Sequence, residues 1–168
     1  MERLQGEKVV LRPLADADLP RMAEIQAQPS VAVRWGAPDE ADLRAKQDGS
    51  EGVVAYAIEL DGDPVGLIEY YEEKDPIYRS AGIDIFLAEE VHGRGLGTDA
   101  VRTLARYLVH ERGHHRLTID PAADNLPAIR AYEKVGFKPV GVMRQYERLP
   151  GGDWHDGLLM DLLAEELG

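Results

Sequence analysis

The chain has 168 residues, of which 44% are hydrophobic and 30% are charged, and it contains no cysteine. This length and apolar content predict one globular domain over residues 1–168 rather than a disordered chain. Without cysteine, a disulfide framework, a thiolate metal site and covalent catalysis through sulfur are excluded. The net charge of −12 argues against nucleic acid and anionic membranes as partners, because both are polyanions.

No run of about 18 uncharged apolar residues occurs, and the first residues lack the apolar segment of a secretory signal. We therefore expect a cytoplasmic, soluble protein. His155 and the pair His114-His115 stand without a third ligand at a useful spacing. We therefore expect no metal ion.

The N-terminal part of the chain predicts one short strand and two helices. The strand covers Lys8–Arg12, and a helix follows over about Ala17–Ala27 with Asp16 as its cap. A second, short and polar helix is expected over Pro38–Gln47, because Asp39 offers a cap at its start.

The middle of the chain predicts antiparallel sheet. Val53–Leu60 and Pro64–Tyr71 form a hairpin across Asp61-Gly62-Asp63, because an Asp-Gly pair favours a two-residue turn. The apolar segment Ala81–Leu87 continues the sheet.

The C-terminal half alternates helices and strands. A helix is expected over Thr98–Arg112, stopped by Gly113, and a strand over Arg116–Asp120. Phe137–Arg148 and Trp154–Leu163 form a last strand pair. These elements predict a mixed α/β (α+β) fold with a central, mostly antiparallel sheet and about four helices.

A glycine-rich run, His92-Gly93-Arg94-Gly95-Leu96-Gly97-Thr98, lies between the Ala81–Leu87 strand and the following helix. Such a turn exposes unpaired backbone N–H groups at the positive end of a helix dipole, which favours phosphate or pyrophosphate. The alternative is that the glycines merely let a turn pack tightly.

Charge is unevenly distributed around this run. Residues 92–116 carry five arginines against Asp99 and Glu111, whereas acidic side chains dominate residues 69–90. An anionic cofactor fits the first segment and a cationic acceptor the second. The alternative is that both are ordinary solvated faces.

The glycine run and the segment after the Arg116–Asp120 strand together resemble the GNAT superfamily of acyl-CoA-dependent N-acyltransferases. The loop pattern of that family is Gln or Arg, two residues, Gly, one residue, then Gly or Ala; Gly95 and Gly97 fill the two small positions. His92 replaces the usual Gln or Arg. The downstream match consists of Asn125, the pair Ala131-Tyr132 and the pair Gly136-Phe137.

The resemblance implies a GNAT fold with acetyl-CoA as the acyl donor. In that fold the strands around Phe86 and Thr118 splay apart, and the pantetheine arm lies in the gap. The loop N–H groups and the Arg94 side chain would hold the pyrophosphate, and Asn125 would bind the pantetheine. The expected cofactor-binding residues are Phe86, Leu87, Ala88, His92, Gly93, Arg94, Gly95, Leu96, Gly97, Thr98, Asn125, Ala128 and Tyr132.

Tyr132 lies seven residues, or two helical turns, after Asn125. It matches the family position whose phenol protonates the leaving sulfur, so the resemblance predicts that it is a catalytic acid. Without the resemblance, a tyrosine that packs its ring and exposes its hydroxyl is the simpler interpretation.

Asp84 is a carboxylate within the apolar strand Gly82–Leu87. Burying a charge there is costly unless it is paired or functional, so we expect a catalytic group that faces a cleft and binds or deprotonates an ammonium. The alternative is an aspartate that is exposed at a sheet edge or held in a salt bridge.

Within the superfamily, the chain looks like the aminoglycoside 6'-N-acetyltransferases, through Trp35-Gly36, the Gly82–Leu87 strand, Thr118–Pro121 and residues 125–137. The resemblance places Asp84 and Asp120 at the acceptor pocket. Glu72, in a shortened acidic loop, is a further candidate for the substrate. Trp35 is either a substrate platform or a core anchor under the N-terminal helices.

The predicted reaction is direct acetyl transfer from acetyl-CoA to a primary amine of a small cationic acceptor, with an aminoglycoside 6'-amine favoured. The segment Gly152–Gly157 looks more like that of acetyltransferases for amines, ribosomal proteins or siderophore precursors. A protein N-terminus, a lysine or a siderophore-precursor amine is therefore an alternative acceptor. A non-enzymatic CoA-binding regulatory module is the third hypothesis. We expect a monomer or a homodimer.

Overall fold

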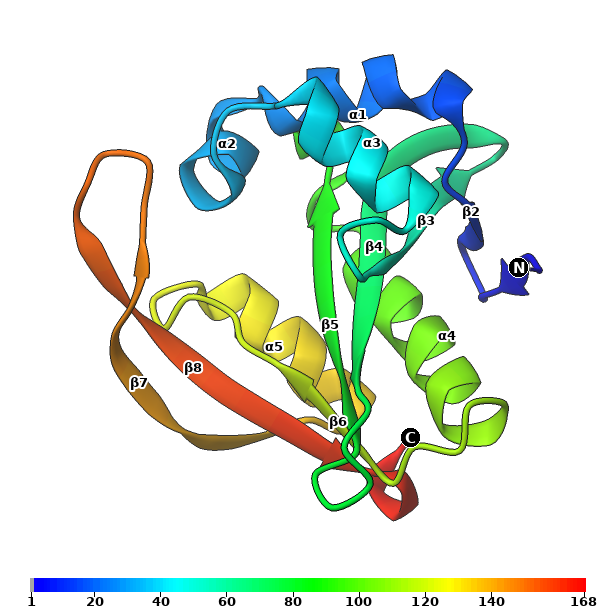
Figure 1. Cartoon of the computed structure of the whole chain (residues 1–168), viewed down its shortest axis with the longest axis vertical. Coiled ribbons are helices and arrows are strands. Elements are labelled where there is room, and N and C mark those ends of the chain that lie inside the picture. Colours follow the sequence, from blue (N-terminus) through cyan, green and yellow to red (C-terminus); the bar gives the residue numbers. More distant parts are fainter. Residues whose placement is uncertain (1) are drawn as a thin grey trace.

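The computed structural model describes residues 2–168, and within this range an eight-stranded sheet is flanked by five α-helices (Figure 1). The strand order is β1-β2-β3-β4-β5-β6-β8-β7. All neighbouring strands are antiparallel except β5 and β6, which are parallel. The strands are β1 (Leu4–Gln5), β2 (Val10–Pro13), β3 (Val54–Leu60), β4 (Asp63–Glu73), β5 (Ser80–Leu87), β6 (Arg116–Ile119), β7 (Lys138–Arg148) and β8 (Trp154–Leu163).

Three of the helices correspond to ranges that the sequence predicts, α5 completes the expected total of about four, and one further helix is not predicted. The unpredicted helix is α2, seven residues that begin at a proline in the first turn, where a missing N–H costs nothing. No helix of residues 2–168 combines the length and apolarity that crossing a membrane requires. The helices are α1 (Leu19–Gln26), α2 (Pro29–Trp35), α3 (Glu40–Asp48), α4 (Leu96–His110) and α5 (Leu126–Val135).

The capping expectations are half correct. Asp39 caps α3 as predicted, because its carboxylate accepts the N–H groups of Ala41 and Asp42. Asp16 does not cap the first helix. Asp18 occupies the N-cap position of α1, and its carboxylate binds Arg12 and the N–H of Ala15. The ion pair with Arg12, six residues earlier, holds Asp18 in place just before this helix.

The predicted hairpin between β3 and β4 is confirmed. Leu60 pairs with Asp63, and the two intervening residues, Asp61 and Gly62, have φ angles of 52° and 85°. Two successive positive φ angles define the turn that best matches the twist of a hairpin, and Asp and Gly are the residues that tolerate them.

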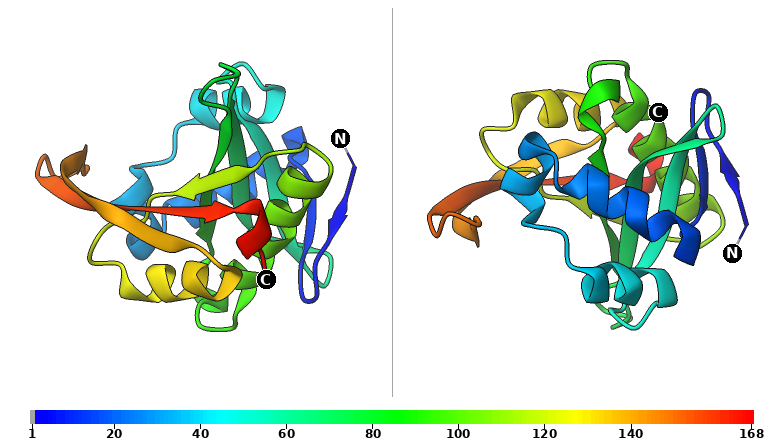
Figure 2. Two further views of the ribbon diagram at one scale, coloured as in Figure 1. Left: turned by 90° about the horizontal axis from the view of Figure 1, so that it is seen from below. Right: turned by 90° about the horizontal axis from the view of Figure 1, so that it is seen from above.

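The two faces of the sheet are covered by different helices. On β4, Glu69 contacts Lys46 of α3, whereas the next residue, Tyr70, packs its ring 6.3 Å from that of Tyr107 on α4. Successive strand residues point to opposite faces. Helix α3 therefore covers one face and α4 the other, an arrangement that Figure 2 shows from two sides.

The parallel strands β5 and β6 separate soon after they meet, as predicted. They pair at Ala81 with Leu117 and at Gly82 with Thr118, and β5 then runs on to Leu87 without β6 beside it. The backbone edge of β5 beyond Gly82 is therefore free on this side within residues 2–168. This opening in the middle of the sheet positions the site described below.

The hairpin formed by β7 and β8 projects beyond the body of the molecule in Figures 1 and 2. Its register shifts between Met143 and Glu147, which pair with Gly157 and His155 of β8. Inside this bulge, Gln145 has a φ of 49°, and its N–H donates to the Asp156 carboxylate at 2.8 Å. A bulge re-aims the side chains beside it.

Candidate active site

A cavity of about 990 Å³ opens where β5 and β6 separate. The end of β5, the glycine loop, the start of α4, the segment after β6 and one face of α5 line it, together with residues of α2 and α3. It therefore gathers most of the residues that the sequence analysis selects. These are Trp35, Asp84, Phe86, Leu87, His92, Gly93, Gly95, Leu96, Gly97, Thr98, Asp120, Asn125, Ala128 and Tyr132.

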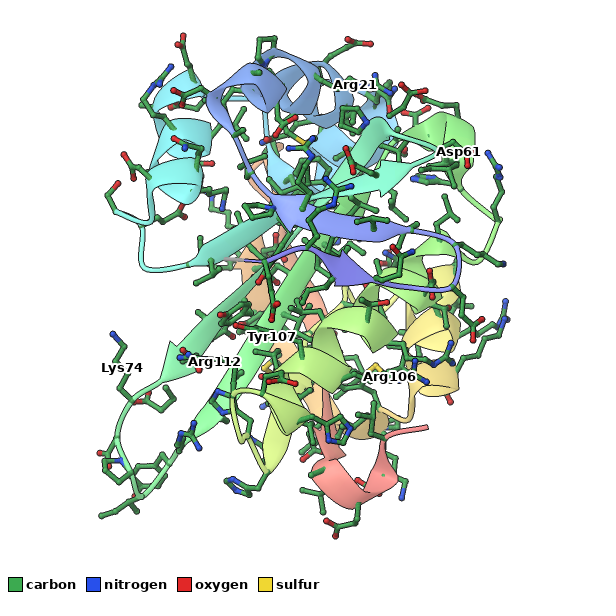
Figure 3. The ribbon with its side chains drawn as sticks, turned by 90° about the vertical axis from the view of Figure 1, so that its right-hand side faces the viewer. Arg21, Asp61, Lys74, Arg106, Tyr107 and Arg112 are labelled. Carbon is green, nitrogen blue, oxygen red and sulfur yellow. The ribbon has the colours of Figure 1, made fainter. Side chains whose placement is uncertain are left out.

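Glu72 lies away from this cavity, and the expectation that it binds the substrate is not carried forward. Its carboxylate binds Arg112 at 2.7 Å and the buried ring of His114 at 2.6 Å. Figure 3 shows Arg112 and Tyr107 beside each other on the α4 side of the molecule. Because Glu72 is three residues after Glu69, the two side chains point to opposite faces of β4.

Two residues expected to bind the cofactor also lie outside the cavity lining. Ala88 is fully buried, and its N–H donates to the carbonyl of Val65 at 2.8 Å. Arg94 lies at the edge of a smaller hollow, shared with Arg21 and Glu90. Its carbonyl accepts a hydrogen bond from Lys8 Nζ at 3.0 Å.

The glycine loop has the geometry of an anion cradle. Gly93 and Gly95 both have a φ of 76°, a conformation that L side chains rarely adopt. Gly95 is the N-cap of α4 and, lacking a side chain, leaves the first N–H groups of the helix uncapped. The N–H groups of Leu96, Gly97 and Thr98 thus face the cavity end of a 15-residue helix, where an anion is stabilised.

Two side chains of the loop fasten it to its neighbours. His92 Nε2 donates to the carbonyl oxygen of Leu87 at 2.8 Å, so the histidine ties the loop to the end of β5. Thr98 Oγ1 donates to the carbonyl of Ala131 at 3.2 Å, which joins α4 to α5. His92 therefore has a structural contact in the position where the resemblance expects Gln or Arg.

Asp84 faces the cavity from β5, directly opposite Glu69 of β4. Burial raises the pKa of Asp84 to about 7, and the nearby carboxylates of Asp120 and Glu69 act in the same direction. A carboxyl group with this pKa exchanges a proton at neutral pH, which suits a general base.

Asp120 follows the last residue of β6 and lines the same cavity. Burial raises its pKa as well, against the opposing effect of a hydrogen bond from Tyr146. The Tyr146 hydroxyl donates to Asp120 Oδ2 at 2.6 Å. This tyrosine comes from the β7 bulge, and the sequence analysis did not select it.

Tyr132 and Asn125 both belong to α5. Burial, and then the charges of Asp84 and Asp120, hold the pKa of Tyr132 above its usual range, so its phenol stays protonated at neutral pH. Asn125 is the N-cap of α5, and its Oδ1 accepts the N–H of Ala128 at 3.4 Å. The structure therefore gives Asn125 a capping role.

A buried ion pair forms a further part of the wall. Lys46 Nζ of α3 lies 3.0 and 3.1 Å from the two carboxylate oxygens of Glu69, and 5.6 Å from the centre of the Trp35 ring. Trp35 also packs edge-on against Phe86 at 5.0 Å. Trp35 thus lines the cavity and also packs in its wall against Phe86 of β5 and Lys46 of α3, and its role as a substrate platform stays a prediction.

Lys46 could not be predicted as a site residue from the sequence, because a lysine in a polar helix is most often exposed. Among residues 2–168, no group of three or more His, Asp or Glu side chains is arranged to hold a metal ion. Further cavity-lining residues that the sequence did not single out are Arg34, Glu51, Glu69 and Glu147.

Comparison with known proteins agrees with this geometry. Residues 8–138 match the family model described as "Acetyltransferase (GNAT) domain". Aminoglycoside N(6')-acetyltransferase type 1 of Klebsiella pneumoniae is 33% identical over 158 residues, which cover 82% of this chain and 78% of the relative. Spermidine N(1)-acetyltransferase of Escherichia coli K12 is 28% identical over 167 residues, or 96% and 89% of the two chains.

Among solved structures, AAC(6')-Ib in complex with paromomycin and acetyl-CoA superposes with a TM-score of 0.77 at 30% identity. The match covers 95% of this chain and 96% of that one. The family model covers far more than half of the sequence, and its region contains the splayed strands, the glycine loop and α5. The chain belongs to the GNAT acetyltransferase family and is an acyltransferase.

Proposed function

We propose that this protein is an acetyl-CoA-dependent N-acetyltransferase that acetylates a primary amine of a small cationic acceptor, with an aminoglycoside 6'-amine as the leading candidate. One observation carries the proposal. Asp84 and Asp120 line the same cavity as the uncapped start of α4 and the buried phenol of Tyr132. Anion cradle, acceptor carboxylates and proton donor thus share one cavity.

The residues present fit acetyl-CoA. The N–H groups of residues 96–98 suit a pyrophosphate, and the free edge of β5 beyond Gly82 offers backbone groups to an amide-bearing arm. Bound there, the cofactor supplies the activated acetyl thioester. The solved relative AAC(6')-Ib, which holds acetyl-CoA, supports the same assignment.

Asp84 and Asp120 would bind and deprotonate the acceptor. An ammonium placed between them relieves the repulsion of two half-buried carboxylates, so binding is favoured by charge. Attack requires the neutral amine, and a carboxylate with a pKa of about 7 can take the proton at Oδ of Asp84. In this mechanism Asp120 retains its negative charge and holds the acceptor in position.

Tyr132 would supply the proton that the departing sulfur needs. Its phenol is 8% exposed and keeps its proton at Oη, because burial and the two neighbouring carboxylates disfavour the phenolate. A group that is protonated at rest can donate as negative charge develops on the leaving atom. Tyr132 and Asp84 thus perform opposite proton transfers in one cavity.

Sequence similarity favours an aminoglycoside over the other acceptors. Two named relatives with at least 30% identity are aminoglycoside 6'-acetyltransferases. A linear polyamine is the second candidate, because Glu147 adds a further cavity carboxylate near Asp120 and a relative acetylates spermidine. Both acceptors carry several ammonium groups.

The test is steady-state release of CoA from acetyl-CoA with matched acceptors. One pair consists of an aminoglycoside with a 6'-amine and its counterpart with a 6'-hydroxyl; spermidine and unstructured peptides complete the panel. Saturable turnover that needs the 6'-amine, with the acetyl group located there by mass spectrometry and NMR, supports the leading candidate. Turnover of peptides with none of the cationic small molecules would overturn it.

A further inference from the structure

The hydroxyl of Tyr146 reaches the acceptor site from outside the cavity. The tyrosine does not line the cavity and is about half exposed (48%), yet its Oη lies 2.6 Å from Oδ2 of Asp120. A 2.6 Å O–H···O contact to a carboxylate is a short, charge-assisted hydrogen bond. The residue is thus placed to act on Asp120 rather than on a bound ligand.

Three features of the β7–β8 hairpin place the hydroxyl there. The bulge between Met143 and Glu147 inserts extra residues in β7, and the positive φ of Gln145 turns the chain. The Asp156 carboxylate fixes this turn by accepting the N–H of Gln145. Gly157 leaves room for the ring, because a Cβ there would approach Tyr146 Cδ2 to 2.9 Å.

A non-glycine residue with positive φ costs free energy and persists where surrounding contacts impose it. The contact with Asp156 and the space at Gly157 both help to place Tyr146 against Asp120. We propose that Tyr146 is a positioning residue of the acceptor site, which orients Asp120 and holds it as the carboxylate that binds the acceptor ammonium. The β7–β8 hairpin is thereby part of the acceptor site. This inference rests on the proposed function.

The charged and titratable groups near Asp120 determine whether its ionised form is favoured or disfavoured. Asp84 of β5 and Glu147 of β7 are carboxyl groups near it, and their negative charges disfavour a further one. The phenols of Tyr71 and Tyr132 also lie near it, and the charge of Asp120 raises the pKa of both. The positive charge of Arg34 acts on Glu147 in the opposite direction and lowers its pKa. Among these groups, Tyr146 donates to Asp120 directly and favours its ionised form.

Removing the hydroxyl has a consequence that depends on pH. Without the donor, Asp120 takes up a proton at higher pH and competes with Asp84 for the single proton of the pair. At acidic pH more molecules then lack the carboxylate that binds the ammonium. At pH 9 both carboxylates are ionised with or without Tyr146, so the loss of charge disappears.

The experiment is the pH dependence of kcat/KM for a cationic acceptor in wild type, Tyr146→Phe and the control Tyr78→Phe. Tyr78 is an exposed tyrosine in the β4–β5 connection, outside the cavity. We expect the acidic limb of Tyr146→Phe to move to higher pH by about 1 unit, which is about a tenfold loss at low pH. The loss should appear in the acceptor KM and shrink to about twofold or less at pH 9.

A second variant tests the route by which the hairpin acts. Gly157→Ala pushes the ring away from Asp120 and should reproduce the low-pH loss of Tyr146→Phe, with an unchanged Kd for CoA. A readout without turnover is the Asp120 carboxyl pKa from ¹³C NMR titration, which should rise in Tyr146→Phe and stay constant in Tyr78→Phe.

The outcomes separate this inference from the proposed function. Wild-type turnover with an unaltered acidic limb in Tyr146→Phe, and an unaltered Asp120 titration, would overturn the positioning role. A loss that is equal at every pH, or that extends to CoA binding, would also overturn it, because it would indicate a merely structural tyrosine. A wild type that turns over no amine at all would reject the proposed function instead, and the NMR titration would still test Tyr146.

Discussion

Glu69 and Asp84 lie directly opposite each other on β4 and β5, but Lys46 binds both oxygens of Glu69 and forms no such contact with Asp84. Within residues 2–168, Asp84 has no salt-bridge partner at 4.0 Å or less. The charge of Glu69 is therefore compensated inside the protein, whereas that of Asp84 is available to a ligand. The site holds an uncompensated acid beside a compensated one.

This asymmetry predicts that Asp84→Asn stabilises the folded protein. The pKa of Asp84 is raised from its ordinary value near 3.8 to about 7, so stability falls as pH rises between these values and stays low above them. Asparagine removes this cost. We expect a gain of up to about 4 kcal/mol in the free energy of unfolding at pH 8 and little gain at pH 4, measured by urea denaturation. An equal gain at pH 8 and pH 4 would contradict the raised pKa of Asp84.

Tyr132→Phe tests the proton donor. The variant keeps the buried ring and removes the Oη proton, so kcat should fall by about 10²-fold, a typical contribution of general acid catalysis. The Kd for CoA, measured by calorimetry, should change by less than about twofold because the ring still packs. Full retained turnover would mean that the departing sulfur is protonated by another group.

Gly95→Ala tests the anion cradle. A side chain is strained at a φ of 76°, and its Cβ would come within 2.9 Å of Lys8 Nζ. The start of α4 should shift, and the Kd for CoA should rise about tenfold or more.

Gly52→Ala is the matched control for Gly95→Ala, because Gly52 has a φ of 86° and open space around it. Both variants should lose about 1 kcal/mol of stability. If Gly52→Ala weakens CoA binding as much as Gly95→Ala, the effect is one of general stability.

Glu72→Gln tests the correction to the predicted substrate residues. The Arg112 side chain, and then His114, hold the pKa of Glu72 below its usual range, so its ion pairs stabilise the fold at neutral pH and are lost on acidification. The variant should lose about 1 kcal/mol at pH 7 and less at pH 3. Its KM for a cationic acceptor should equal that of wild type, and a severalfold rise would return Glu72 to the acceptor site.

Much of the site is predictable from the sequence because its parts lie in local patterns. A few neighbouring residues are enough to recognise the glycine run at a strand-to-helix junction as an anion site. The same holds for Asp84, a carboxylate inside an apolar strand. The hairpin at Asp61-Gly62 is equally local, and the structure confirms it.

The remaining parts depend on contacts between distant segments. Lys46 can be buried because the carboxylate of Glu69, 23 residues later in the sequence, binds its ammonium group. Tyr146 reaches Asp120 because of a bulge in β7, and the alternation of polar and apolar residues in the sequence does not predict this bulge. The sequence predicts that Glu72 lies in a loop after the strand Pro64–Tyr71, but β4 extends to Glu73, so Glu72 points to the face opposite Glu69.

The central claim is that the two cavity carboxylates bind the amine that becomes acetylated. The most direct measurement compares kcat/KM for the best cationic acceptor between wild type and Asp84→Asn/Asp120→Asn, alongside the Kd for CoA. We predict that acceptor kcat/KM falls by about 10³-fold or more while CoA binding changes less than about twofold. A double variant that retains the wild-type kcat/KM, or that loses CoA binding to the same extent, would contradict the claim.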